Sequence, residues 1–133
     1  MAAKENNVIE NLDGIFKLYS EIKLVYFFGS RARGEDGPLS DYDFAVYLEE
    51  KDPKKRFETQ LKLLAQLTKE LKTNDVDLCV LNDTERPELN YNIIKDSKLI
   101  YEKEPFKVLV EPQILNEYFD FIYLLRKYNL TKA

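Results

Sequence analysis

The run IKLVYFF, residues 22–28, carries apolar side chains at both odd and even positions after Lys23, and Gly29 ends it. Successive side chains of a strand point to opposite faces, so a strand of this kind is buried on both faces. The run therefore predicts a strand inside a sheet whose two faces are both covered by other elements.

Further strands and helices alternate along the 133 residues. Apolar spacing predicts a helix over about 5–20, and Asp52 with Pro53 has the N-cap and first-turn chemistry of a second helix. The buried face of that second helix is predicted to consist of Phe57, Leu61, Leu64, Ala65, Thr68 and Leu71. The other predicted elements are strands at 42–48, 76–81 and 99–102, the last at a sheet edge, and helices at 87–95 and 112–128. This order indicates one α/β (α+β) domain over residues 1–133.

The predicted helix 112–128 is apolar around more of its circumference than one buried stripe requires. Its apolar residues are Ile114, Leu115, Tyr118, Phe119, Phe121, Ile122, Leu124 and Leu125. Two interpretations stay open: a helix deep in the core of this domain, or a helix of which part meets another chain. Tyr123 and Tyr128 suit such an interface.

Charge and composition exclude several kinds of site. The net charge is -4, which argues against a protein whose main affinity is for a nucleic-acid backbone. The chain has no histidine, so it has neither a Ser-His triad nor the usual zinc ligand. One cysteine forms no internal disulfide, and the polar start MAAKENN differs from a signal peptide. We expect a cytoplasmic protein that does not span a membrane.

Two aspartates open the second predicted strand. Asp41 and Asp43 are two residues apart, so their carboxylates are expected on one face, about 7 Å apart along the strand. Like charges at the mouth of a buried strand repel unless a cation or hydrogen-bond donors offset them. Because carboxylate oxygens suit magnesium, both residues are predicted to bind it.

Asp77 is a third candidate, in the predicted strand 76–81. Its side chain faces away from its apolar neighbours, so an adjacent strand could bring it beside Asp43. Three carboxylates in one cleft would suit two magnesium ions and an in-line phosphoryl displacement, and Asp77 could also accept the proton of an attacking hydroxyl. Asp75 has the same parity but precedes the apolar run, so it ranks second.

The segment between the first two strands predicts a phosphate site. Gly29 lets backbone amides approach a phosphate closely, and Ser30 offers a hydroxyl. Arg31 and Arg33 add positive charge that would offset the negative charge of a triphosphate through charge-assisted hydrogen bonds. Each feature is common by itself. A strand, Gly-Ser, ten residues, Asp-x-Asp and a later strand-borne aspartate are far less common in combination.

This combination resembles a known signature. Gly29-Ser30, ten residues and then Asp41-Tyr42-Asp43 match the GSx10DxD pattern of the nucleotidyltransferase superfamily that includes DNA polymerase β. More closely, the span GSRARGEDGPLSDYDFAVYL resembles the minimal nucleotidyltransferases, the antitoxin halves of HEPN/minimal nucleotidyltransferase toxin–antitoxin pairs. The order of elements and the aspartate in VDLCVL extend the resemblance over residues 8 to about 102.

The resemblance implies a mixed sheet with flanking helices and a magnesium-dependent transfer of AMP from ATP to a hydroxyl, with loss of pyrophosphate. By matching position, Gly29 and Ser30 would hold the triphosphate, Asp41 and Asp43 would bind the metals, and Asp77 would be the third carboxylate. In such antitoxins the acceptor is a tyrosine of the HEPN ribonuclease toxin. The implied partner is therefore a HEPN toxin, in complex with this chain.

Two other functions stay open. Small-molecule nucleotidyltransferases that resemble the aminoglycoside-modifying enzymes generally carry a second domain for the acceptor, and about thirty residues follow residue 102 here. A non-catalytic antitoxin would block its toxin by occlusion through the apolar helix 112–128, although three intact aspartates argue against it. The nucleotide itself is not fixed by any residue, so ATP follows from the resemblance alone.

Overall fold

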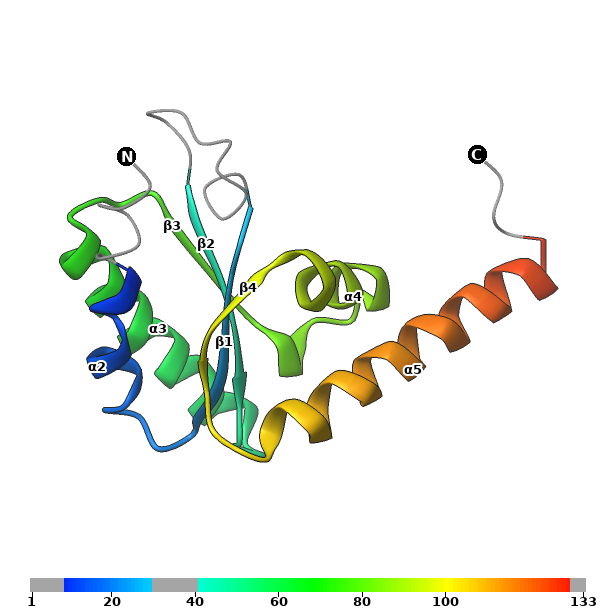
Figure 1. Cartoon of the computed structure of the whole chain (residues 1–133), viewed down its shortest axis with the longest axis horizontal. Coiled ribbons are helices and arrows are strands. Elements are labelled where there is room, and N and C mark those ends of the chain that lie inside the picture. The colour runs from blue at the N-terminus through cyan, green and yellow to red at the C-terminus, as the bar shows by residue number, and fades with distance from the viewer. Residues whose placement is uncertain (1–8, 30–40, 130–133) are drawn as a thin grey trace.

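A four-stranded sheet forms the centre of the computed structural model, which describes residues 9–29 and 41–129 (Figure 1). Its strands are β1 (Ile22–Phe28), β2 (Tyr42–Leu48), β3 (Val76–Val80) and β4 (Lys98–Glu102), in the spatial order β3-β2-β1-β4. β1 is antiparallel to both β2 and β4, whereas β2 and β3 are parallel. The predicted mixed sheet and the edge position of the last strand are therefore confirmed. β3 ends one residue before the predicted boundary.

Helices cover both faces of this sheet. The helical elements are α2 (Asp13–Phe16), α3 (Pro53–Leu71), η1 (Leu81–Asp83), α4 (Pro87–Asp96) and α5 (Phe106–Lys127). In Figure 1, α2 and α3 lie on one side of the sheet, and α4 and the start of α5 lie on the other. This arrangement confirms the prediction from the run 22–28, since a strand that is apolar on both faces requires cover on both.

The alternating side chains of β1 and β2 pack into two separate hydrophobic clusters, one on each face of the sheet. Val25, Phe27 and Phe44 are buried in the cluster on the side of α2 and α3. Tyr26 and Ala45 are buried in the cluster on the side of α4 and α5. The central strands thus contribute apolar surface to both layers, and this burial supplies most of the driving force for the fold.

The first predicted helix is wrong in its extent. Instead of a continuous helix over about 5–20, the described part has helical backbone at Ile9 and Glu10, a turn, and then the four-residue α2. Leu12 and Phe16 nevertheless lie buried in the core, as their spacing predicted. Asn11 lies in the turn that interrupts the helix, and its short polar side chain competes with helical hydrogen bonds.

The second helix begins as predicted, but a different face is buried. The Asp52 side chain accepts a hydrogen bond from the Lys54 backbone amide at 3.0 Å, and Pro53 occupies the first helical position. The buried residues are Thr59, Leu63 and Leu67, and Leu64 and Leu71 pack partly against the core. Phe57, Leu61 and Ala65 are exposed, in contrast to the prediction.

The last helix starts earlier than predicted and is mostly exposed. α5 begins at Phe106, so Pro112 lies inside it and does not open it. Val110 and Ile114 are its buried residues, and Figure 1 shows its C-terminal half extending away from the sheet. The interpretation of a helix deep in this domain's own core is therefore wrong. Its anchor is a hydrogen bond of 2.6 Å from the buried Tyr26 hydroxyl to the Glu111 carboxylate.

None of the helices in the described ranges is long and apolar enough to cross a membrane.

Candidate active site

The predicted acidic residues meet where β1 ends and β2 and β3 begin. Asp43 is the second residue of β2, and the sheet register places it opposite Phe28 of β1 on one side and Asp77 of β3 on the other. In a sheet, residues in register project from the same face. The structure thus brings Asp77 beside Asp43, as the parity of the third strand predicted.

Gly29 lies next to the Asp43 carboxylate, at the end of β1. It follows β1 with a φ of +86°, in the region that favours glycine. A Cβ atom at this position would lie 3.1 Å from Asp43 Cγ and would overlap the carboxylate oxygen Oδ2. The absence of a side chain at Gly29 therefore lets the Asp43 carboxylate lie directly against the backbone that leads out of β1.

Cys79 lies below the two carboxylates on the same sheet face. It is two residues after Asp77 in β3 and in register with Ala45 of β2. Burial raises the pKa of the Cys79 thiol to about 11, with smaller contributions from the Asp77 and Asp43 carboxylates. Cys79 was not among the predicted site residues, although its i+2 spacing from Asp77 was the available signal. A neutral thiol is therefore the next side chain on the sheet face that carries the Asp43 and Asp77 carboxylates.

The remaining predicted site residues are less closely placed. Asp41 is exposed and precedes β2, so it lies outside the strand in which it was predicted. Ser30, Arg31 and Arg33 lie outside the described residues. Within residues 9–29 and 41–129, no three Asp, Glu or Cys side chains are arranged to hold a metal ion. The Asp43 and Asp77 carboxylates are hard oxygen ligands of the type that magnesium takes in ones or twos from a protein, so the donor pair fits that ion.

The match to a family model decides the identity of the fold. The model described as polymerase beta, nucleotidyltransferase matches residues 10–106, which include every described residue of the candidate site. The chain belongs to this nucleotidyltransferase family. Because the matched region covers all four strands, α2, α3 and α4, the nucleotidyltransferase domain is the sheet and its packed helices. Most of α5 follows the matched region.

Solved structures share this nucleotidyltransferase fold over nearly the whole chain. A toxin–antitoxin complex with AMP-PNP contains a chain at 22% identity and a TM-score of 0.71, covering 92% of this chain and 93% of that one. A tri-AMPylated HEPN toxin from Shewanella oneidensis in complex with an MNT antitoxin gives 21% identity, a TM-score of 0.66 and coverages of 92% and 93%. The MntA–HepT toxin–antitoxin gives 21% identity, a TM-score of 0.66 and coverages of 92% and 94%. No curated protein matches the chain in sequence.

Proposed function

We propose that this nucleotidyltransferase transfers AMP from ATP to a tyrosine hydroxyl of a HEPN toxin in the cytoplasm and thereby acts as its antitoxin. The observation that carries the proposal is the register of Asp43 with Asp77 beside Gly29, in a chain of the polymerase beta nucleotidyltransferase family. The similar solved structures support the choice of nucleotide and partner, since one contains AMP-PNP and another an AMPylated HEPN toxin.

The reaction is a displacement at the α-phosphorus of ATP. The acceptor oxygen forms a bond to that phosphorus, the bond from the phosphorus to the bridging oxygen breaks, and pyrophosphate leaves. Asp77 is the residue that would accept the proton of the attacking hydroxyl. Gly29 would lie beside the triphosphate, with Ser30, Arg31 and Arg33 as further phosphate ligands. Two magnesium ions, held by Asp43 and Asp77 with Asp41 as the third carboxylate, would offset the negative charge of the phosphates.

The exposed half of α5 would contact the toxin. Phe119, Tyr123, Leu124 and Tyr128 are between 50% and 62% exposed, and exposed apolar patches often mark sites of protein–protein interaction. Tyr118 stacks on Tyr91 of α4 at a ring distance of 3.9 Å. Aromatic side chains of this kind are enriched in protein interfaces. The acceptor hydroxyl would then be supplied by the partner, as the proposal requires.

Label transfer from ATP labelled at the α-phosphate tests the activity. The chain is incubated with magnesium and a lysate of its source cell, and the wild type is compared with the Asp41→Asn, Asp43→Asn variant. The control is Glu58→Gln, Glu70→Gln, which removes the same two charges from exposed positions of α3. We expect label on a protein band with the wild type and the control, and none with the aspartate variant.

The other outcomes separate the competing functions. Label on small molecules alone would overturn the protein acceptor and favour a small-molecule nucleotidyltransferase. Toxin neutralisation that persists in the Asp41→Asn, Asp43→Asn variant, without label on any protein, would favour occlusion by α5. A variant in which both Phe119 and Tyr123 are replaced by serine should lose toxin binding whether the antitoxin acts by occlusion or by AMP transfer. It therefore tests the contact surface independently of the chemistry.

A further inference from the structure

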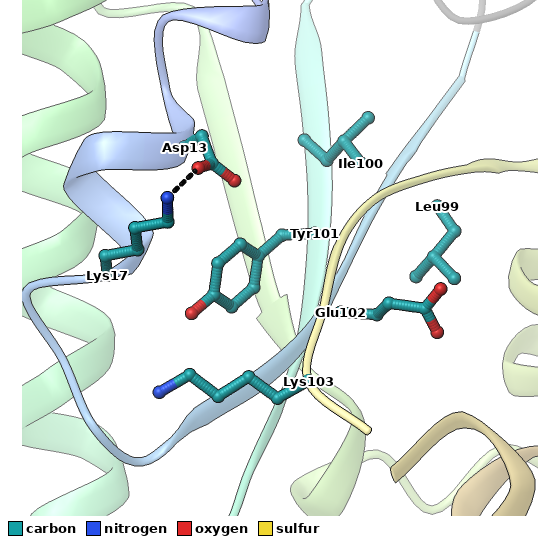
Figure 2. Close-up of a pocket in the computed structure, with 7 residues that line it drawn as sticks. All are labelled: Asp13, Lys17, Leu99, Ile100, Tyr101, Glu102 and Lys103. Atoms are coloured by element: carbon teal, nitrogen blue, oxygen red, sulfur yellow. Dashed lines mark ion pairs between the residues drawn. The ribbon is translucent and has the colours of Figure 1, made fainter. Parts of the chain in front are cut away.

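A cavity lies at the β4 edge of the sheet, away from the Asp43 and Asp77 carboxylates. It has a volume of about 650 Å³ and is bordered by α2, by β4 and by Lys103 just after that strand. β1 separates β4 from β2, so neither Asp43 nor Asp77 lines it. Figure 2 shows that Tyr101 and Lys103 extend toward α2, where Asp13 and Lys17 lie, whereas Leu99 and Glu102 extend to the other side.

A β-bulge in β4 creates this arrangement. Tyr101 pairs with Val25 and Leu99 pairs with the next residue of β1, so Ile100 is the extra residue of the bulge. Without the bulge, Leu99 and Tyr101 would share a face. With it, Leu99 joins the core beside α4 and α5, and Tyr101 points to the side of α2. Bulges commonly redirect a side chain in this way.

The Tyr101 hydroxyl is the unusual group in the cavity. Tyr101 is 6% exposed and its ring packs on Phe16 at a centroid distance of 5.5 Å. Its hydroxyl is buried and has no hydrogen-bond partner among the described residues. Burial, and after it the Asp13 carboxylate, raises the pKa of Tyr101, so the hydroxyl is a hydrogen-bond donor at neutral pH. A buried polar group without a partner is costly, and most such groups in proteins are paired.

Two ammonium groups accompany the hydroxyl. Lys17 Nζ lies 2.9 Å from Asp13 Oδ2, and an ammonium that makes one ion pair keeps further N–H donors. Lys103 forms no ion pair with any residue of the described ranges. Figure 2 shows the Tyr101 hydroxyl on the same side of β4 as the Lys17 and Lys103 side chains. The charged residues that line the cavity are Asp13, Lys17, Glu102 and Lys103, so their formal charges sum to zero. Glu102 extends to the other side of β4, so the side of α2 holds the two ammonium groups and Asp13.

We propose that the cavity between α2 and β4 binds the phosphoryl group of a small molecule, through Lys17, Lys103 and the Tyr101 hydroxyl. Two ammonium groups and a hydroxyl on the lining of one cavity offer several separate donors, which match an oxyanion with several oxygens better than a planar carboxylate. The cavity volume is in the range of sites for small ligands, so it has room for more than the phosphoryl group. The site does not depend on the proposed AMP transfer, because it shares no residue with the carboxylate pair.

Titration of the purified chain with inorganic phosphate and with pyrophosphate, followed by calorimetry, tests the proposal. The variants are Tyr101→Phe and Lys103→Met, and the control is Lys62→Met, which removes the same charge from an exposed position of α3. We expect each of the first two variants to weaken phosphate binding by about tenfold, as loss of a hydrogen bond to a charged group does. The control should bind as the wild type does. Asp43→Asn should also keep phosphate binding, which separates this site from the carboxylate pair.

The thermal stability of Tyr101→Phe makes the test decisive. The substitution keeps the ring on Phe16, so we expect no loss of melting temperature in phosphate-free buffer. Unchanged phosphate affinity in both Tyr101→Phe and Lys103→Met would overturn the proposal. So would sodium acetate binding as tightly as phosphate at equal ionic strength, because the site would then recognise carboxylates. A Lys62→Met variant that loses binding as much as Lys103→Met would show general charge attraction, and would overturn it too.

Discussion

Replacement of Gly29 by alanine should distort the candidate site and lower the free energy of unfolding by an amount that follows from the structure. A non-glycine residue at the φ of +86° costs about 1–2 kcal/mol. The added Cβ also overlaps Asp43 Oδ2, and moving that side chain away from its preferred rotamer costs about another 1 kcal/mol. We therefore expect Gly29→Ala to lower the free energy of unfolding by about 2–3 kcal/mol, or ~10 °C in melting temperature for a domain of this size.

The two contributions can be separated by a double-mutant cycle. In an Asp43→Ala background the overlap with Oδ2 is gone, so Gly29→Ala should cost only the backbone part, about 1–2 kcal/mol. Urea denaturation of the wild type, both single variants and the double variant gives the coupling free energy directly, and we expect about 1 kcal/mol.

Equal costs of Gly29→Ala in the two backgrounds would refute this reasoning, because the Asp43 carboxylate would then not lie against residue 29. The effect on activity should exceed the effect on stability. A displaced Asp43 carboxylate no longer faces Asp77, so label transfer should fall by at least tenfold at a temperature at which Gly29→Ala is still folded.

Two further predictions concern buried groups. Tyr26→Phe removes the hydrogen bond to Glu111 and should lower the free energy of unfolding by about 1–3 kcal/mol, with faster amide exchange in α5 than in β1. The second follows from the raised pKa of Cys79, about 11. Between about pH 9 and 11 the unfolded chain loses this proton before the folded chain does, so stability should fall by up to about 1.4 kcal/mol per pH unit as pH rises. Cys79→Ala should show a shallower decline in denaturation curves at pH 8, 9 and 10.

Each of these has a clear contrary result. Equal acceleration of amide exchange in β1 and α5 would mean that Tyr26 stabilises the whole domain and not the attachment of α5. An identical pH dependence in the wild type and Cys79→Ala would mean that the thiol is not held neutral, since the two proteins differ only at this residue.

The strands were predictable because local sequence decides them. The bounds of β1 and β2 follow from apolar runs and from Gly29, and the pairing of Asp43 with Asp77 follows from the two-residue period of a strand. The bulge at Ile100 was not predictable, because no glycine marks it and its cause is the need to send Leu99 and Tyr101 to different layers. The cavity beside β4 was missed for the same reason.

The helices show where local patterns are insufficient. α3 has two adjacent apolar stripes, and the sheet selects the one that begins at Thr59, whose hydroxyl donates to the Glu21 carboxylate at 2.7 Å. Phe57 and Leu61 belong to the other apolar stripe, which stays exposed to solvent. Pro112 is a common signal for the first turn of a helix, but α5 continues through it because Val110 and Ile114, on either side, are both buried. Tertiary packing decides both cases.

The edge position of β3 has a consequence for how the candidate site opens. β3 pairs with β2 alone. Near the start of β3, Asp77 lies in register with Asp43 of β2, so two carboxylates of like charge are neighbours there. On its outer side, the Gln60 amide holds the Leu78 carbonyl at 2.8 Å, one residue further along. Fraying of the sheet should therefore start at Val76 and Asp77 and stop at Leu78. A bound cation would be visible as slower amide exchange in those first residues, even when no substrate is present.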